Sequence, residues 1–242
     1  MDIQPDKTDP ILEVSDLDCF YGDLQVIRQV CFKVLDGDVV ALFGPNGHGK
    51  STLLKTIGGI HPTANGVVRF QGRDITQSPV EQRVEMGLVY IPEDKNLFLD
   101  MSVLENLCMG AFNKRARKHL ATGLQFVFSL FPRLAERKSQ SAMTLSGGEA
   151  RMLAIGRGMM SRAALLMIDE PSIGLSPLLK KTVFEAIRQI HSNSETSILV
   201  VEQEVEYPLK LAKRIYLLSK GRIVLEKQAG EINKTQIEKA YF

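Results

Sequence analysis

Gly44-Pro-Asn-Gly-His-Gly-Lys-Ser-Thr52 decides the fold of this chain, and it follows directly on the apolar run Val39–Phe43. The segment fits the pattern G-x-x-x-x-G-K-[ST], whose glycines let backbone N–H groups turn toward phosphate oxygens that a Cβ atom would block. Leu53-Leu-Lys55 opens a predicted helix, and the free N–H groups at a helix N-terminus favour an anion. The sequence therefore predicts a strand, a phosphate-binding loop and a helix, against the alternative of a plain glycine turn.

Two side chains of this loop have predicted roles of their own. Lys50 is expected to reach the β- and γ-phosphates of a nucleotide, where its charge would also serve catalysis. The Ser51 hydroxyl is expected to ligate Mg²⁺. The residues of the loop that we expect to contact the nucleotide are Gly44, Pro45, Asn46, Gly47, His48, Gly49, Lys50, Ser51 and Thr52.

Length and charge limit the class of protein. The chain has 242 residues, which suits one large domain or two small ones. Its net charge of +2 argues against a dedicated nucleic-acid surface, and we interpret the basic cluster Lys114–Lys118 as a solvated helix start. No apolar stretch approaches the roughly 18 residues that a membrane span needs. The polar residues 1–9 predict a loose leader and do not resemble a signal peptide.

The cysteines indicate the compartment. Cys19, Cys31 and Cys108 are odd in number and lack the spacing of metal ligands. We therefore predict that all three are reduced core residues of a cytosolic protein.

The order of apolar runs predicts an α/β fold. Ile11–Val34 predicts an antiparallel pair of strands, and short apolar runs such as Leu88–Ile91 and Ser197–Val201 predict buried parallel strands. Between about 94 and 161 the apolar positions recur at helical spacing without strand runs. The predicted organisation is a single domain with a core at about 10–93 and 162–228, an inserted α-helical subdomain at about 94–161 and a short helical tail at 229–242.

A second motif, Leu165-Leu-Met-Ile-Asp169-Glu170, is an apolar strand that ends in two carboxylates. Asp169 is predicted to hold Mg²⁺ beside Ser51, because hard cations prefer oxygen ligands. Glu170 is predicted to be the catalytic base that polarises water for attack on the γ-phosphate. A strand capped by solvated carboxylates is the alternative for this motif alone.

A third motif, Leu145-Ser-Gly-Gly-Glu149, precedes a helix-forming stretch from Ala150 to Met160. A serine N-cap followed by two glycines makes a second anion site, although such a motif alone is usually a capped helix. The three motifs in this order resemble the ATP-binding subunits of ABC transporters, over about Ile11 to Lys227. The resemblance implies a P-loop NTPase core with a RecA-like parallel sheet, an N-terminal antiparallel β subdomain and an α-helical subdomain. It also implies two chains facing head to tail, with Ser146, Gly147, Gly148 and Glu149 of each closing on the ATP of the other.

Further roles are implied only by this resemblance. Tyr21 stands where the family stacks an aromatic ring on adenine, with a core tyrosine as the alternative. Glu93 replaces the usual glutamine that senses Mg²⁺, and we expect it to ligate the metal, through water for part of the time. Gln203 replaces the usual γ-phosphate histidine, so it is expected to position phosphate without acting as an acid or base. Ser172-Ile-Gly-Leu175 lacks the aspartate that commonly ends this segment in the family, and with it the contact that this aspartate makes across the dimer.

Some of these departures resemble one branch of the family, the second ATPase (the F-type subunit) of branched-chain amino-acid importers. The shared features are Pro-Glu at 92–93, Met-Leu-Ala-Ile-Gly at 152–156 and Val-Glu-Gln at 201–203. Ala150-Arg151 departs from the paired glutamines of that branch.

The resemblance implies an ATP-hydrolysing subunit that uses ATP and Mg²⁺ on the cytoplasmic face of the cell membrane. Its partners would be integral membrane permease subunits, a second ATPase subunit (a related chain or a second copy) and, indirectly, an extracytoplasmic solute-binding protein, with no nucleic acid. Lys95–Arg137 would grip a helix of the membrane subunit, with Leu97-Phe98-Leu99 as anchors or as core. The alternatives are an importer of urea or short amides, a soluble ABC ATPase on ribosomes or DNA, and a regulatory subunit without hydrolysis. Lys50, Asp169 and Glu170 argue against the last of these.

Overall fold

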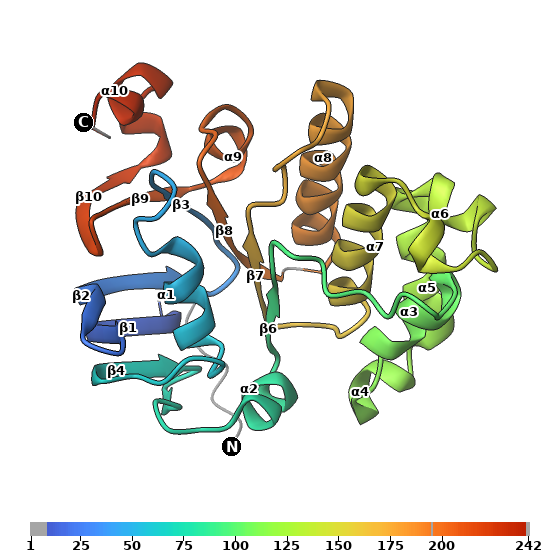
Figure 1. Cartoon of the computed structure of the whole chain (residues 1–242), viewed down its shortest axis with the longest axis horizontal. Coiled ribbons are helices and arrows are strands. Elements are labelled where there is room, and N and C mark those ends of the chain that lie inside the picture. The colour runs from blue at the N-terminus through green and yellow to red at the C-terminus, as the bar shows by residue number, and fades with distance from the viewer. Residues whose placement is uncertain (1–8, 195, 241–242) are drawn as a thin grey trace.

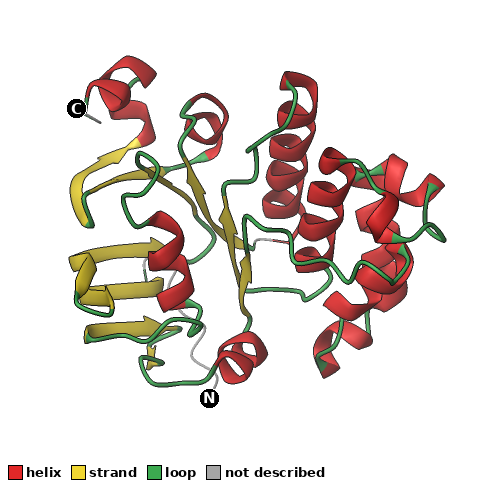
Figure 2. Ribbon diagram, in the orientation of Figure 1, coloured by secondary structure: helices red, strands yellow, loops and turns green. Residues whose placement is uncertain are grey.

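The computed structural model describes residues 9–194 and 196–240 (Figure 1). The predicted leader therefore lies outside the described residues apart from Asp9, as does the end of the predicted tail. Strands gather at one end of the molecule and helices α3–α7 at the other (Figure 2). Over the described ranges, no helix has the length and apolar character needed to cross a membrane.

A 6-stranded sheet forms the centre of the fold, in the order β10-β9-β3-β8-β7-β6. Strands β9, β3, β8, β7 and β6 run parallel, and β10 closes the edge by pairing antiparallel with β9 in a hairpin. Their common direction brings the ends of β3, β7 and β8 to one edge, where the predicted phosphate loop and carboxylates follow. The bounds are β3 Val39–Phe43, β6 Leu88–Ile91, β7 Leu165–Asp169, β8 Ser197–Glu202, β9 Arg214–Ser219 and β10 Arg222–Gln228.

A 4-stranded antiparallel sheet, in the order β2-β1-β4-β5, makes the predicted N-terminal β subdomain. The prediction for the cysteines is wrong in one case, because Cys31 on β2 is exposed while Cys19 is buried. Cys31 lies between the buried Val30 and Phe32, so the alternation of the strand turns it to the outer face, where its thiol donates to Asp16 Oδ1. The bounds are β1 Pro10–Tyr21, β2 Leu24–Leu35, β4 Asn65–Phe70 and β5 Arg73–Asp74.

Helices cover both faces of the central sheet, with α1 on one side and α7 and α8 on the other (Figure 1). The helix that begins at Glu206 ends at Leu211, because the Lys213 N–H already donates to Val39 O of β3. The bounds are α1 Lys50–Ile57, α2 Val80–Met86, α3 Val103–Gly110, α4 Lys114–Arg117, α5 Leu120–Leu130, α6 Pro132–Glu136, α7 Gly147–Met159, α8 Pro177–Ser194, α9 Glu206–Leu211 and α10 Lys234–Lys239.

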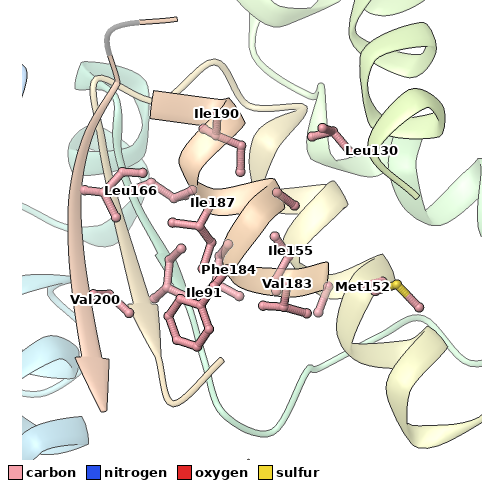
Figure 3. Packing of buried hydrophobic residues seen from close by; sticks show 14 of the residues in the cluster. Ile91, Leu130, Met152, Ile155, Leu166, Val183, Phe184, Ile187, Ile190 and Val200 are labelled. Atoms are coloured by element: carbon pink, nitrogen blue, oxygen red, sulfur yellow. The ribbon is translucent and has the colours of Figure 1, made fainter. Parts of the chain in front are cut away.

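Strand β3 is buried along its whole length, because both of its faces are covered. Ala41 and Phe43 join the hydrophobic cluster under α7 and α8, whereas Val40 and Leu42 join the cluster under α1 and the antiparallel sheet. Figure 3 shows how α8 packs on the sheet, with Val183, Phe184, Ile187 and Ile190 near Ile91, Leu166 and Val200. This double burial fixes the strand that delivers the phosphate loop.

Candidate active site

The predicted phosphate loop joins β3 to α1, and its glycines are required by geometry. Gly49 has a φ of 100°, which side chains rarely adopt, and a Cβ on Gly44 would lie 2.4 Å from the carbonyl oxygen of Leu218. No side chain caps the N-terminus of α1. Its first-turn N–H groups are therefore available to an anion.

A cavity of about 270 Å³ opens beside this loop. Glu93 and Glu170 line it together with the loop, so residues from three distant segments meet there. The described residues around it do not include Tyr21, Gln203 or Ser146–Glu149. The lining consists of Val26, Asn46, Gly47, Gly49, Lys50, Ser51, Thr52, Glu93, Glu170 and Ile173.

Lys50 and Glu170 form a buried ion pair at this cavity. Lys50 Nζ lies 2.9 Å from Glu170 Oε1, and the two side chains are only 4% and 8% exposed. Lys50 Nζ also donates to Pro45 O and Asn46 Oδ1 at 3.2 and 3.3 Å. A bound phosphate group and the Glu170 carboxylate would therefore compete for the same cation.

Asp169 ends β7 directly before Glu170 and is fully buried. Its Oδ2 accepts a hydrogen bond of 2.9 Å from the Tyr90 hydroxyl. Within the part of the chain that the structure describes, no hydrogen-bond donor reaches Oδ1. Burial raises the pKa of this carboxyl, and the nearby hydroxyls of Ser51 and Tyr90 oppose that shift. A buried oxygen without a partner, beside a serine hydroxyl, fits a hard cation such as Mg²⁺.

Glu93 follows β6 by two residues and is half-buried in the cavity wall. Its pKa is raised, first by burial and then by the like charges of Glu170, Asp169 and Asp94. A cation held at this cluster of carboxylates would relieve that repulsion.

The remaining predicted residues lie around this centre. Tyr21 is exposed at the end of β1, and its ring centroid is 4.2 Å from that of His61. Gln203 is exposed and follows β8, which lies between β3 and β7 in the sheet. His48 belongs to the phosphate loop, but its Nδ1 accepts from the Lys220 N–H at 3.3 Å, so the ring braces the loop against the β9–β10 hairpin.

The third motif forms the predicted N-cap of α7. The Ser146 hydroxyl accepts from the Glu149 N–H, and the Glu149 carboxylate accepts from the Ser146 N–H at 2.9 Å, which completes a capping box. Arg137 Nε lies 2.9 Å from Glu149 Oε1. Glu149 therefore shapes the helix end, while the N–H groups of Gly147 and Gly148 begin its first turn.

Comparison with known proteins agrees with this geometry. A family model described as ABC transporter matches residues 27–173. The chain is 38% identical over 232 residues to the high-affinity branched-chain amino acid transport ATP-binding protein BraG of Pseudomonas aeruginosa, covering 96% of this chain and 99% of that protein. The chain belongs to the ABC transporter family.

Two further proteins support this assignment of an ABC transporter ATPase. The probable branched-chain amino acid transport ATP-binding protein LivF of Archaeoglobus fulgidus is 33% identical, over 92% of this chain and 94% of that protein. The crystal structure of an ABC transporter's ATP-binding cassette in its ADP conformation superposes with a TM-score of 0.78 and 25% identity, covering 97% of this chain and 95% of that one. The predicted P-loop NTPase fold and nucleotide-binding ATPase class are confirmed.

Sequence reasoning assigned no role to Arg151, which this ABC transporter ATPase buries beside Asp169 and Glu170. Its guanidinium donates to the backbone carbonyls of Pro92, Glu93, Asp169, Glu170 and Pro171. Glu170 has a positive φ of 42°, a strained value for a residue other than glycine. Arg151 thus ties α7 to the loop after β6 and to the strained turn that presents Glu170. The only sequence signal was its departure from the family's glutamine.

Glu202 is a second buried charge that sequence reasoning left without a role. It ends β8, and its Oε1 accepts from the Ser172 N–H at 2.9 Å. Burial raises the pKa of this carboxyl to about 7, the Ser172 N–H opposes the shift, and the charge of Glu170 adds to it.

A pH-dependent stability follows from this shift. The folded protein holds the Glu202 proton more tightly than the unfolded chain does. The contribution of Glu202 to the free energy of unfolding therefore falls as the pH rises from about 4.5 to about 7. We therefore compare the unfolding free energy of Glu202→Gln with that of the native protein at two pH values. The difference in favour of the variant should be larger at pH 8 than at pH 5, by on the order of 2 kcal/mol. Urea unfolding at both pH values measures this difference. The control Glu204→Gln, on an exposed neighbouring residue, should change stability equally at both pH values. The same equal change in Glu202→Gln would contradict the predicted pH dependence.

Proposed function

We propose that this chain is the ATP-hydrolysing subunit of an importer for branched-chain amino acids, bound peripherally at the cytoplasmic face of the membrane. The observation that carries the catalytic part is the ion pair of Lys50 and Glu170 at one cavity, with Asp169 directly before Glu170 and its Oδ1 without a partner among the described residues. The solute class is supported by the names of the two relatives from Pseudomonas and Archaeoglobus.

The geometry suggests how each side chain would act on ATP. Lys50 would leave Glu170 for the β- and γ-phosphates, which frees the Glu170 carboxylate to polarise water for in-line attack. Ser51 and Asp169 Oδ1 would hold Mg²⁺, with Glu93 reaching it directly or through water, and the bound metal would supply charge neutralisation at the phosphates. The Gln203 amide would donate to a γ-phosphate oxygen, and the exposed Tyr21 ring would stack on adenine.

The third motif supports an arrangement of two ATPase subunits. Ser146–Glu149 form a capped helix start that is separate from the chain's own phosphate loop. We infer that this helix end contacts ATP held by a second ATPase subunit, a related chain or another copy. The whole chain would then act as one nucleotide-binding domain, with about 94–161 as the helical subdomain that carries this contact.

An apolar groove supports the contact with a membrane subunit. It has a volume of about 520 Å³ between β6 and α3, and exposed apolar side chains surround it. Leu97 packs against the core, whereas Phe98 and Leu99 are exposed. Of the three residues expected to be either anchors or core, Leu97 is therefore a core residue, and Phe98 and Leu99 are available as anchors. We propose that a cytoplasmic helix of the permease docks here. The exposed members of the lining are Ile60, Phe98, Met109 and Phe112.

Capture of this chain from detergent-solubilised membranes of its own cells tests the assignment. We expect permease subunits and a second ATPase to accompany the native chain. Phe112→Glu should reduce the captured permease about tenfold or more, because a charge would be buried in an apolar contact. The control Val224→Glu, on an equally exposed apolar residue of β10, should capture normal amounts.

Ribosomal or DNA-repair proteins without any membrane subunit would overturn the transport function and leave the ATPase chemistry standing. Equal capture by Phe112→Glu and the native chain would reject the groove as the docking surface.

A further inference from the structure

Tyr90 is a residue of β6 whose side chain reaches Asp169, the proposed metal ligand at the end of the neighbouring strand β7. Strands β6 and β7 are parallel, with Tyr90 opposite Met167 and Ile91 opposite Ile168. The Tyr90 ring packs on the hydrophobic cluster beneath α1. From there its hydroxyl donates to Asp169 Oδ2 at 2.9 Å.

This hydrogen bond makes the two oxygens of Asp169 unequal. Oδ2 has a donor, while Oδ1 is buried and without one among the described residues. A carboxylate with one oxygen held by a hydrogen bond has little freedom to rotate. The other oxygen, Oδ1, is therefore oriented to ligate a metal ion before the ion binds. The partner of Oδ2 is a side chain of a different strand, so strand pairing fixes the geometry.

We propose that Tyr90 is a positioning residue for the metal ion, holding Asp169 so that Oδ1 alone faces the Mg²⁺ of the bound nucleotide. The inference rests on the proposed function, because it concerns the metal of that same site. Residues that orient a metal ligand typically change metal affinity about 10–100-fold when they are removed. Tyr90→Phe removes only the hydroxyl and keeps the ring that packs under α1.

A matched control exists elsewhere in the fold. Tyr216 on β9 is a buried tyrosine whose hydroxyl lies 3.2 Å from a carboxylate oxygen, Glu226 Oε1, and 3.2 Å from Lys33 O. It packs edge-on against Phe32 and does not line the nucleotide cavity among the described lining residues. Tyr216→Phe therefore measures what the loss of a buried tyrosine hydroxyl costs without touching the metal ligand.

Binding of a fluorescent ATP analogue to the purified full chain tests the proposal without turnover. The affinity is measured in EDTA and during titration with Mg²⁺, and the thermal unfolding midpoint of each variant is recorded. We expect the native chain, Tyr90→Phe and Tyr216→Phe to bind equally in EDTA. Tyr90→Phe should need about tenfold more Mg²⁺ to reach the half-maximal effect, with Tyr216→Phe unchanged.

Several outcomes would overturn the proposal. An unchanged Mg²⁺ midpoint in Tyr90→Phe would show that the hydroxyl does not position the ligand. An equal loss of affinity in EDTA and in Mg²⁺, or a Mg²⁺ shift shared by Tyr216→Phe, would show general structural support instead. If the native chain bound the analogue under neither condition, the proposed function would be overturned as well. Native binding therefore distinguishes a failure of the proposed function from a failure of the role proposed for Tyr90.

Discussion

Replacing Glu170 by glutamine is expected to slow ATP turnover by about 10²–10⁴ while ATP remains bound. The amide keeps the size of the side chain but cannot accept the proton of the attacking water. It also ends the ion pair with Lys50, whose Nζ lies 2.9 Å from Glu170 Oε1. Because the lysine is then free for phosphate, we expect ATP to bind more tightly to Glu170→Gln than to the native chain.

Calorimetric titration with ATP and single-turnover hydrolysis by the captured complex measure these two effects. The control is Glu204→Gln, which removes an exposed carboxylate paired with Lys180 and should change neither quantity. Near-native turnover in Glu170→Gln would rule out Glu170 as the base. Weaker ATP binding would contradict the competition between phosphate and carboxylate.

Replacing Arg151 by methionine is expected to cost on the order of 3 kcal/mol of unfolding free energy, because several buried carbonyls lose their donor. The carbonyls belong to the loop after β6 and to the turn at Asp169–Pro171. The positive φ of Glu170 is strained, so the turn that presents this carboxylate should relax when Arg151 is gone. We expect turnover to fall in the fraction that remains folded.

Urea unfolding at 25 °C measures the loss of stability. Arg157→Met is the matched control on the same helix, because its guanidinium donates to the Lys95 carbonyl, and not to the turn at Asp169–Pro171, and stacks over the Phe98 ring. It should cost less and leave ATP binding unchanged. An Arg151→Met protein within 1 kcal/mol of the native chain, or less affected than Arg157→Met, would contradict this account.

The fold and the centre of the site could be predicted because their signals are local. Each motif is recognised within a few residues: one is a glycine loop after an apolar strand, and the other is an apolar strand that ends in Asp169-Glu170. Parallel pairing of β3, β8 and β7 then brings the two motifs to one edge of the sheet. Local pattern and topology together were therefore sufficient to predict that Lys50, Ser51 and the two carboxylates lie close together.

The supporting contacts could not be predicted because they join segments far apart in the sequence. Arg151 bonds to Pro92 O, 59 residues away, and the Tyr90 hydroxyl bonds to an aspartate 79 residues away. Neither contact follows from a propensity or a short pattern, since an arginine on a predicted helix is expected at the surface and a tyrosine on a predicted strand is expected to pack in the core. Cys31 is a different case, because the alternation of buried residues along β2 already indicated an exposed position.

The most direct test of the central claim is uptake of labelled leucine by proteoliposomes that contain the complex captured with this chain, with ATP supplied on the side of the ATPase subunits. The account predicts uptake that requires ATP and Mg²⁺ and that stops in the Glu170→Gln complex although ATP still binds. Uptake that continued without ATP, or that persisted undiminished in Glu170→Gln, would contradict it.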